Sequence, residues 1–199
     1  PSLMADVQIV STEDQLRSAV ENGGDIEIAL NQSIVLSGGR TGIEITGGRS
    51  VTIDLGGHTL TGAAETYAIR AVGSTLIVKN GTITVDEWYD SWSYGIDNRG
   101  SKVTVENVIF TSRAGQYAGD AVTANWNDGT PGTTFLKNVT VESGFDWGVT
   151  AYNDSQNVLT IEGGSYQCDI TAEGGTVNIN GGDFTGKVLN QGYMNISGG

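Results

Sequence analysis

Short runs of alternating apolar and polar residues follow one another along almost the whole chain. One set of these runs reads, in order, GIEIT, AIRAV, GIDNR, AVTAN, GVTAY, DITAE and KVLNQ. An apolar residue in each run recurs after 26, 27, 26, 27, 21 and 18 residues, at Ile43, Ile69, Ile96, Val122, Val149, Ile170 and Val188. Alternation with a period of two indicates strands with one buried face, and recurrence at this spacing indicates a repeat architecture.

A second alternating run follows each of the first, with inward residues aligned as Leu55, Val78, Val105, Leu136, Ile161, Ile179 and Ile196. Two positions further on, the chain carries only Asn or Gly, at Gly57, Asn80, Asn107, Asn138, Gly163, Gly181 and Gly198. Asn and Gly tolerate the left-handed backbone conformation, so this column predicts one tight turn repeated in every coil. A third strand then brings in Leu60, Ile83, Phe110, Val141, Tyr166 and Phe184.

Three short strands per coil predict an all-β fold, a three-sided parallel β-helix of about seven coils stacked about 4.8 Å apart. The segment TIDLGGHTLTG at 52–62 is similar to the early coils of many members of the right-handed parallel β-helix, or pectin-lyase-like, superfamily, and the resemblance extends over 26–199. It implies a right-handed coil, which the spacing alone does not. Because the superfamily includes polysaccharide lyases, glycosidases, epimerases, phage tailspikes and non-catalytic surface proteins, the resemblance leaves the function open.

The segment before the first coil has a helical pattern. In STEDQLRSAVEN at 11–22, Thr12 and Gln15 are placed as a capping box. The apolar residues that share one helix face are Leu16, Ala19 and Val20. We expect residues 1–25 to form an N-terminal segment whose helix caps the solenoid, and residues 26–199 to form the β-helix with an uncapped C-terminal end. The open last coil is then a site for self-association or a protein partner.

Composition narrows the possible partners. The chain of 199 residues has 30 Gly and 2 Pro without a three-residue period, which excludes collagen. A net charge of −13 argues against nucleic-acid binding. No apolar run suits a membrane span, and no secretory signal is visible. A single cysteine, Cys168, and a single histidine, His58, exclude an internal disulfide and His-rich metal sites, so neither a metal nor another cofactor is expected.

The outward positions near the first-strand anchors are candidates for chemistry. Aromatic residues gather there, and the candidates for stacking on sugar rings are Trp88, Trp92, Tyr94, Trp126, Trp147 and Tyr152. Charged residues occupy the same side at Arg70, Asp97, Arg99 and Asp120. Asp97 with Asp120 is the nearest candidate for the carboxylate pair that glycoside hydrolysis needs. The opposing interpretation is structural: the charges neutralise one another between coils, and the aromatic residues fold their own loops.

We therefore expect a non-enzymatic structural or adhesion module, with carbohydrate binding as an open candidate. A phage virion component, such as a head fibre, decoration or tail protein, or a bacterial surface protein fits this expectation and places the chain at a virion or cell surface. The alternative is a polysaccharide lyase or glycoside hydrolase that uses Arg70, Asp97, Arg99 and Asp120 on the outer face of the first sheet.

Overall fold

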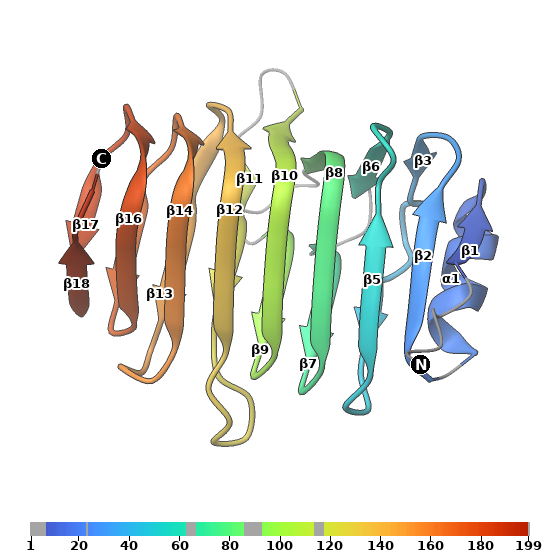
Figure 1. Ribbon diagram of the computed structural model, residues 1–199, viewed down its shortest axis with the longest axis horizontal. Coiled ribbons are helices and arrows are strands. Elements are labelled where there is room, and N and C mark those ends of the chain that lie inside the picture. Colours follow the sequence, from blue (N-terminus) through green and yellow to red (C-terminus); the bar gives the residue numbers. More distant parts are fainter. Residues whose placement is uncertain (1–6, 23, 63–66, 86–92, 114–117, 199) are drawn as a thin grey trace, which may run out of the picture.

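The computed structural model describes residues 7–22, 24–62, 67–85, 93–113 and 118–198, and there it consists of parallel β-sheet and one helix (Figure 1). The larger sheet, which we name sheet 2, has eleven strands. Its main path is β1 (Val7–Val10), β2 (Ile26–Leu30), β5 (Ser50–Asp54), β8 (Thr75–Val85), β10 (Lys102–Ser112), β12 (Thr133–Val141), β14 (Val158–Tyr166), β16 (Thr176–Phe184) and β18 (Tyr193–Ile196). Two short strands, β3 (Ile34–Val35) and β6 (Thr59–Gly62), pair with each other, and β6 also pairs with β8.

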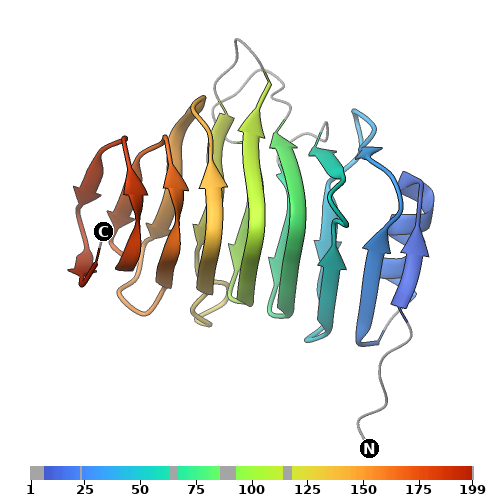
Figure 2. The same cartoon turned by 45° about the horizontal axis from the view of Figure 1, so that its top comes forward.

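The second sheet, which we name sheet 1, is built from the strands predicted as the first of each coil. It consists of β4 (Ile43–Ile45), β7 (Tyr67–Val72), β9 (Tyr94–Arg99), β11 (Ala118–Ala124), β13 (Phe145–Tyr152), β15 (Ile170–Glu173) and β17 (Val188–Asn190), side by side in that order. The chain alternates between the sheets, so strands that neighbour each other in a sheet are not consecutive in sequence. Figures 1 and 2 show the two sheets facing each other along the molecule. All-β class and parallel pairing are thus confirmed, and the arrangement is compatible with a β-helix.

The columns of apolar residues predicted from the spacing are confirmed by the strand registers. In sheet 1, the paired positions run through Ile43, Ile69, Ile96, Val122, Val149, Ile170 and Val188. In sheet 2, the predicted third-strand column runs through Leu60, Ile83, Phe110, Val141, Tyr166 and Phe184. Each apolar side chain therefore stacks on another of its kind in the next strand.

One predicted alignment is wrong, in the first complete coil. The sequence alignment set Leu55 against Val78, whereas the structure pairs Ile53 with Val78. Two extra residues then form a loop before pairing resumes at Thr59 with Thr82, which brings Leu60 opposite Ile83 as predicted. The loop contains Gly56 and Gly57, with φ of 59° and 80°. Because both residues occupy the left-handed region, β5 and β6 stay separate strands at this turn.

The predicted column of left-handed turns is present in most coils. Positive φ values occur at Gly57, Asn80, Asn107, Asn138 and Gly163. The prediction is wrong at Gly181 and Gly198, which have no positive φ. In β16 the register shifts so that Glu162 pairs with Gly181 rather than with Asn180, and the positive φ, 125°, moves to Gly182. The shift is local, because Ile161 with Ile179 and Tyr166 with Phe184 are paired at the same spacing, so the turn moves by one position without an inserted residue.

The Asn turns also join two predicted strands into one. Strands β8, β10, β12, β14 and β16 each continue from the predicted second strand into the third. In the pairing of β10 with β8, ladder partners resume at Val108 and Gly81, directly after Asn107 and Asn80. A single left-handed residue bends the strand without ending its pairing, so the described strands form two sheets instead of three.

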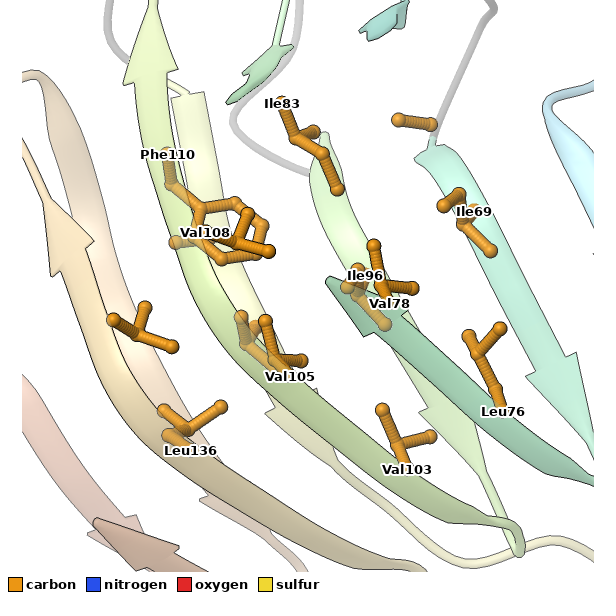
Figure 3. Packing of buried hydrophobic residues seen from close by; sticks show 14 of the residues in the cluster. Ile69, Leu76, Val78, Ile83, Ile96, Val103, Val105, Val108, Phe110 and Leu136 are labelled. Atoms are coloured by element: carbon orange, nitrogen blue, oxygen red, sulfur yellow. The ribbon is translucent and has the colours of Figure 1, made fainter. Parts of the chain in front are cut away.

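Apolar side chains fill the space between the sheets. Figure 3 shows Val78 and Val105 of sheet 2 together with Ile69 and Ile96 of sheet 1, all of which are fully buried. The cluster of buried side chains continues from Val10 at one end to Ile179 near the other. Since each such side chain contributes about 1.5–3 kcal/mol on burial, this core is the main source of stability.

The predicted helix is confirmed as α1 (Glu13–Glu21). Thr12 is the N-cap and accepts a hydrogen bond from the Gln15 backbone N–H at 3.2 Å. The buried residues are Leu16, Ala19 and Val20, as the periodicity predicts. The helix contacts β1, β2 and β4 at one end of the sheets, which is the place expected of a cap (Figure 2).

The exposed face of the Asn turns is held by an amide ladder. The Asn138 amide donates to Asn107 Oδ1 at 2.8 Å, and the Asn107 amide approaches Asn80 Oδ1 at 3.4 Å. Asn80 in turn donates to the Asp54 carboxylate at 3.2 Å. Each Asn therefore supplies both the left-handed backbone and a hydrogen bond between adjacent strands.

We predict that Asn107→Ala lowers the free energy of unfolding by about 1–2 kcal/mol, because Ala is strained at a φ of 54° and loses the ladder bonds. The matched variant Asn107→Gly also loses the bonds but accepts this φ, so it should retain about 1 kcal/mol more stability than the Ala variant. Urea unfolding of the three proteins measures both differences. Equal stabilities of the Ala and Gly variants would show that the left-handed turn is not what the Asn supplies.

Candidate functional site

Irregular pairing of β11 with its neighbours places the side chains of Tyr94 and Asp120 on the outer face of sheet 1. Asp120 of β11 pairs with Tyr94 of β9 and with Gly148 of β13, and the register against β13 shifts on both sides of Asp120. A Cβ added to Gly95 would lie 2.9 Å from the Phe110 ring, so Gly95 backs onto the interior. Its neighbour Tyr94 consequently points outward, and bulges of this kind re-aim Asp120 in the same way.

Asp97 lies at the centre of the charged cluster and has no solvent-exposed surface. Its carboxylate accepts a hydrogen bond from Arg70 Nε at 2.7 Å and a bifurcated one from Arg99 Nε, at 3.0 Å to Oδ1 and 3.1 Å to Oδ2. Thr123 Oγ1 donates to the same carboxylate at 3.4 Å. The structure thus brings these three predicted residues together, and the two guanidinium groups neutralise one buried carboxylate.

The Arg70 guanidinium continues the cluster into the preceding coil. It lies 3.9 Å from the centre of the Tyr67 ring, and the Tyr67 hydroxyl donates to Glu44 Oε2 at 3.0 Å. Burial raises the pKa of Tyr67, and so does the hydrogen bond to Glu44. Cation–π and ionic contacts therefore link three successive strands of this face.

Asp120 has a different environment from Asp97. Its side chain is 1% exposed, and it accepts hydrogen bonds from Thr150 Oγ1 at 2.6 Å and from the Tyr152 hydroxyl at 2.8 Å. The pKa of the Asp120 carboxyl is raised to about 7, mainly by burial. The two hydrogen bonds lower it but do not offset the burial, and the carboxylates of Asp97 and Glu173 add to the rise. Two neighbouring carboxyl groups with such different surroundings are a recurring feature of acid–base sites.

The two tyrosines predicted to stack on sugars lie inside this cluster. Tyr94 is 8% exposed, and burial raises the pKa of its hydroxyl to about 12, with Asp120 and Asp97 adding to the rise. Burial likewise raises the pKa of Tyr152, whose hydroxyl is bound to Asp120. Tyr94 is therefore too buried to stack on a sugar, whereas the partly exposed Tyr152 has its hydroxyl engaged by Asp120.

Two of the predicted tryptophans are exposed, Trp126 by 47% and Trp147 by 44%. Trp147 lies near the start of β13, whereas Trp126 follows the end of β11. Because these neighbouring strands run in the same direction, the two rings are at opposite ends of the outer face. The other two candidates, Trp88 and Trp92, lie outside the described residues.

Two polar features were not predicted from the sequence. Thr123, Thr150 and Thr171 are buried on the outer face, and Thr171 Oγ1 has no hydrogen-bond partner among the described residues. On the inner side, the buried Asn98 amide donates to the Ser101 and Thr133 carbonyls at 3.2 and 3.0 Å. A polar residue at an inward strand position was the available signal for Asn98, whereas nothing in the Thr column signalled burial.

Among the described residues, no three His, Cys, Asp or Glu side chains lie closely enough together to hold a metal ion. The one helix described has nine residues, and no helix there is suited to crossing a bilayer.

Comparison with family models, with curated proteins and with solved structures found no match to this chain.

We predict that Asp97→Asn lowers the free energy of unfolding by about 2–4 kcal/mol, since it leaves two partly buried guanidinium groups without their carboxylate. Asp54→Asn is the control, because the Asp54 carboxylate is more exposed and its ion pair with Lys79, at 3.6 Å, is worth at most about 1 kcal/mol. Urea unfolding at pH 7 measures both. A loss for Asp97→Asn no larger than that of the control would contradict the neutralising role of Asp97.

Proposed function

We propose that the chain is a rigid, non-enzymatic structural or adhesion module, built as a three-sided, right-handed parallel β-helix of about seven coils of the pectin-lyase-like superfamily. The regular columns of sheets 1 and 2 support the coil pattern, and the right hand rests on the resemblance of 52–62 to that superfamily. A continuous core with a ladder of paired polar residues outside it is suited to bearing load along the stack.

The observation that supports a non-enzymatic function is that the charged side chains of this face bind one another. Asp97 and Asp120, the carboxyl groups that catalysis would use, are at most 1% exposed. Arg70 is bound to Asp97 and stacked on Tyr67. A polysaccharide could reach the carboxyl groups of Asp97 and Asp120 only after the cluster had opened, because both are buried and hydrogen-bonded to other side chains.

Exposed side chains indicate where such a module would make contacts. Trp126 and Trp147 offer aromatic faces to a glycan on the outer face of sheet 1. At the edge of sheet 2, Tyr193 and Ile196 of β18 are 61% and 64% exposed, which favours a second copy or a protein partner there. A phage head fibre, decoration or tail protein, or a bacterial surface protein, is the setting that we propose for these contacts.

We predict that a glycan bound by this chain loses about tenfold in affinity in Trp126→Ala or in Trp147→Ala, because each change removes an exposed stacking surface. The matched control is Ile109→Ala, which removes a 40% exposed apolar side chain from sheet 2. A glycan array followed by calorimetry on each variant provides the affinities. Full binding by both Trp variants would remove the aromatic site, and equal losses in the control would show that the effect is not specific to sheet 1.

A polysaccharide lyase or glycoside hydrolase remains the second candidate because Asp120 has a raised pKa of about 7 and lies on the same face as Asp97. If the module is non-enzymatic, a polysaccharide panel should yield neither new reducing ends nor unsaturated product with the purified chain. Turnover that disappears in both Asp97→Asn and Asp120→Asn, with the fold retained, would overturn the non-enzymatic function and assign the reaction to this pair.

A further inference from the structure

Both hydrogen bonds of the Asp120 carboxyl cross from β11 to β13. Thr150 Oγ1 is 2.6 Å away and the Tyr152 hydroxyl 2.8 Å away, and both residues belong to β13. These bonds span the place where the main-chain register between the two strands is irregular. The side chain of Asp120 therefore fastens a strand pair that the backbone ladder holds less completely at this point.

No cation is paired with Asp120 among the described residues. The nearby guanidinium groups of Arg70 and Arg99 are both engaged by Asp97, and the described ion pairs do not include Asp120. The titratable groups that act on it are Tyr94 and Asp97 of β9, Tyr152 of β13, Cys168 in the turn before β15, and Glu173 of β15. Arg70 of β7 and Arg99 of β9 act on its neighbours Tyr94 and Asp97. An ionised Asp120 is thus a buried anion beside two other carboxylates, with its nearest cations already paired.

The partners of Asp120 accommodate its neutral form well. A hydroxyl group both donates and accepts hydrogen bonds, so Thr150 and Tyr152 can accept a hydrogen bond from a protonated carboxyl as well as donate one to a carboxylate. Thr171, which is next to Thr150 in register, has a buried hydroxyl without a described partner. The hydroxyl partners of Asp120 therefore do not require an ionised carboxylate, and no described cation compensates one.

We propose that Asp120 is a proton-controlled latch between β11 and β13, which holds the two strands tightly when the carboxyl is protonated and lets them open more readily when it is ionised. The geometry that supports this latch is the full burial of Asp120, the exclusive use of hydroxyl partners on β13 and the diversion of both guanidinium groups to Asp97. It does not depend on what the outer face binds.

The direction of the pH dependence follows from the two states of the carboxyl. In the closed strands, burial raises the pKa to about 7, whereas an opened strand exposes the carboxyl to water and returns it to its ordinary value of 3.8. Between these values the closed form binds more protons than the open one. The latch is consequently strongest below about pH 4, weakens as the pH rises towards 7, and changes little above that.

Hydrogen exchange at pH 5, 6, 7 and 8, corrected for the intrinsic rate at each pH, tests the latch. We expect the opening equilibrium for amides of Ala118–Ala124 and Phe145–Tyr152 to rise about tenfold per pH unit up to about pH 7 and to level off beyond it. In Asp120→Asn the same amides should show no such rise. Asp128→Asn, which removes the same charge from an exposed position after β11, should behave as the unaltered protein does.

A pH rise that survives in Asp120→Asn, or its absence from the unaltered protein, would overturn the latch. Should Asp120→Asn fail to fold, carbon-detected NMR of the unaltered protein still decides, because it follows the Asp120 carboxyl directly. A titration midpoint close to 7 supports the latch, and a midpoint below 5 contradicts it.

Discussion

Stacking of each strand on the next at about 4.8 Å, in register and in the same direction, is the constraint on which the rest of the structure depends. It gives every side chain a neighbour at the same position in the strand above and in the strand below. The side chains at one position in successive strands, which form a column, must therefore make favourable contacts with one another. The column through Ile69 and Ile96 meets this condition by apolar contact, and the column through Asn107 and Asn138 meets it by hydrogen bonds between amides.

Charged columns meet the same condition by alternating in sign. Lys79, Glu106, Lys137 and Glu162 occupy paired positions in successive strands of sheet 2. Lys137 and Glu106 approach to 3.0 Å. On sheet 1, Arg70 stands beside Asp97 in the same way. Asp120 is the exception, because its column contains Tyr94 and Gly148, neither of which carries a compensating charge. A buried acid with a raised pKa arises where the bulges interrupt the alternation.

The need for compatible side chains at equivalent positions in successive strands explains how much of the fold the sequence could predict. Spacing alone identified the anchors and most of the left-handed turns, because these depend on contacts that recur in every coil, and the helix followed from its own capping and periodicity. It failed where one coil departs from the others: at the two-residue insertion with Gly56 and Gly57, and at the local register shift that moves the turn from Gly181 to Gly182. Such local changes leave the period of the neighbouring coils intact, so the repeat does not reveal them.

The sequence predicted which charged residues lie near one another in the candidate site, but it did not predict that their side chains are buried. The spacing placed Arg70, Asp97 and Asp120 on one face, and the structure joins Arg70 to Asp97 by a direct bond. Repeat position states which residues are neighbours along the stack, but it carries no information on how deeply a face is covered. The burial of Thr150 and Asp120 therefore had no signal in the sequence.

Gly148 connects the buried acid to the exposed surface. It pairs with Asp120, has a φ of 76°, and would place a Cβ only 2.4 Å from the Asp169 carbonyl oxygen, so no other residue fits without displacing the backbone. Trp147, 44% exposed, precedes it directly. In the latch proposed for Asp120, opening of β13 away from β11 would carry the backbone of Trp147 with it. The latch therefore predicts that the protonation of one buried carboxyl is coupled to the position of an aromatic ring on the surface.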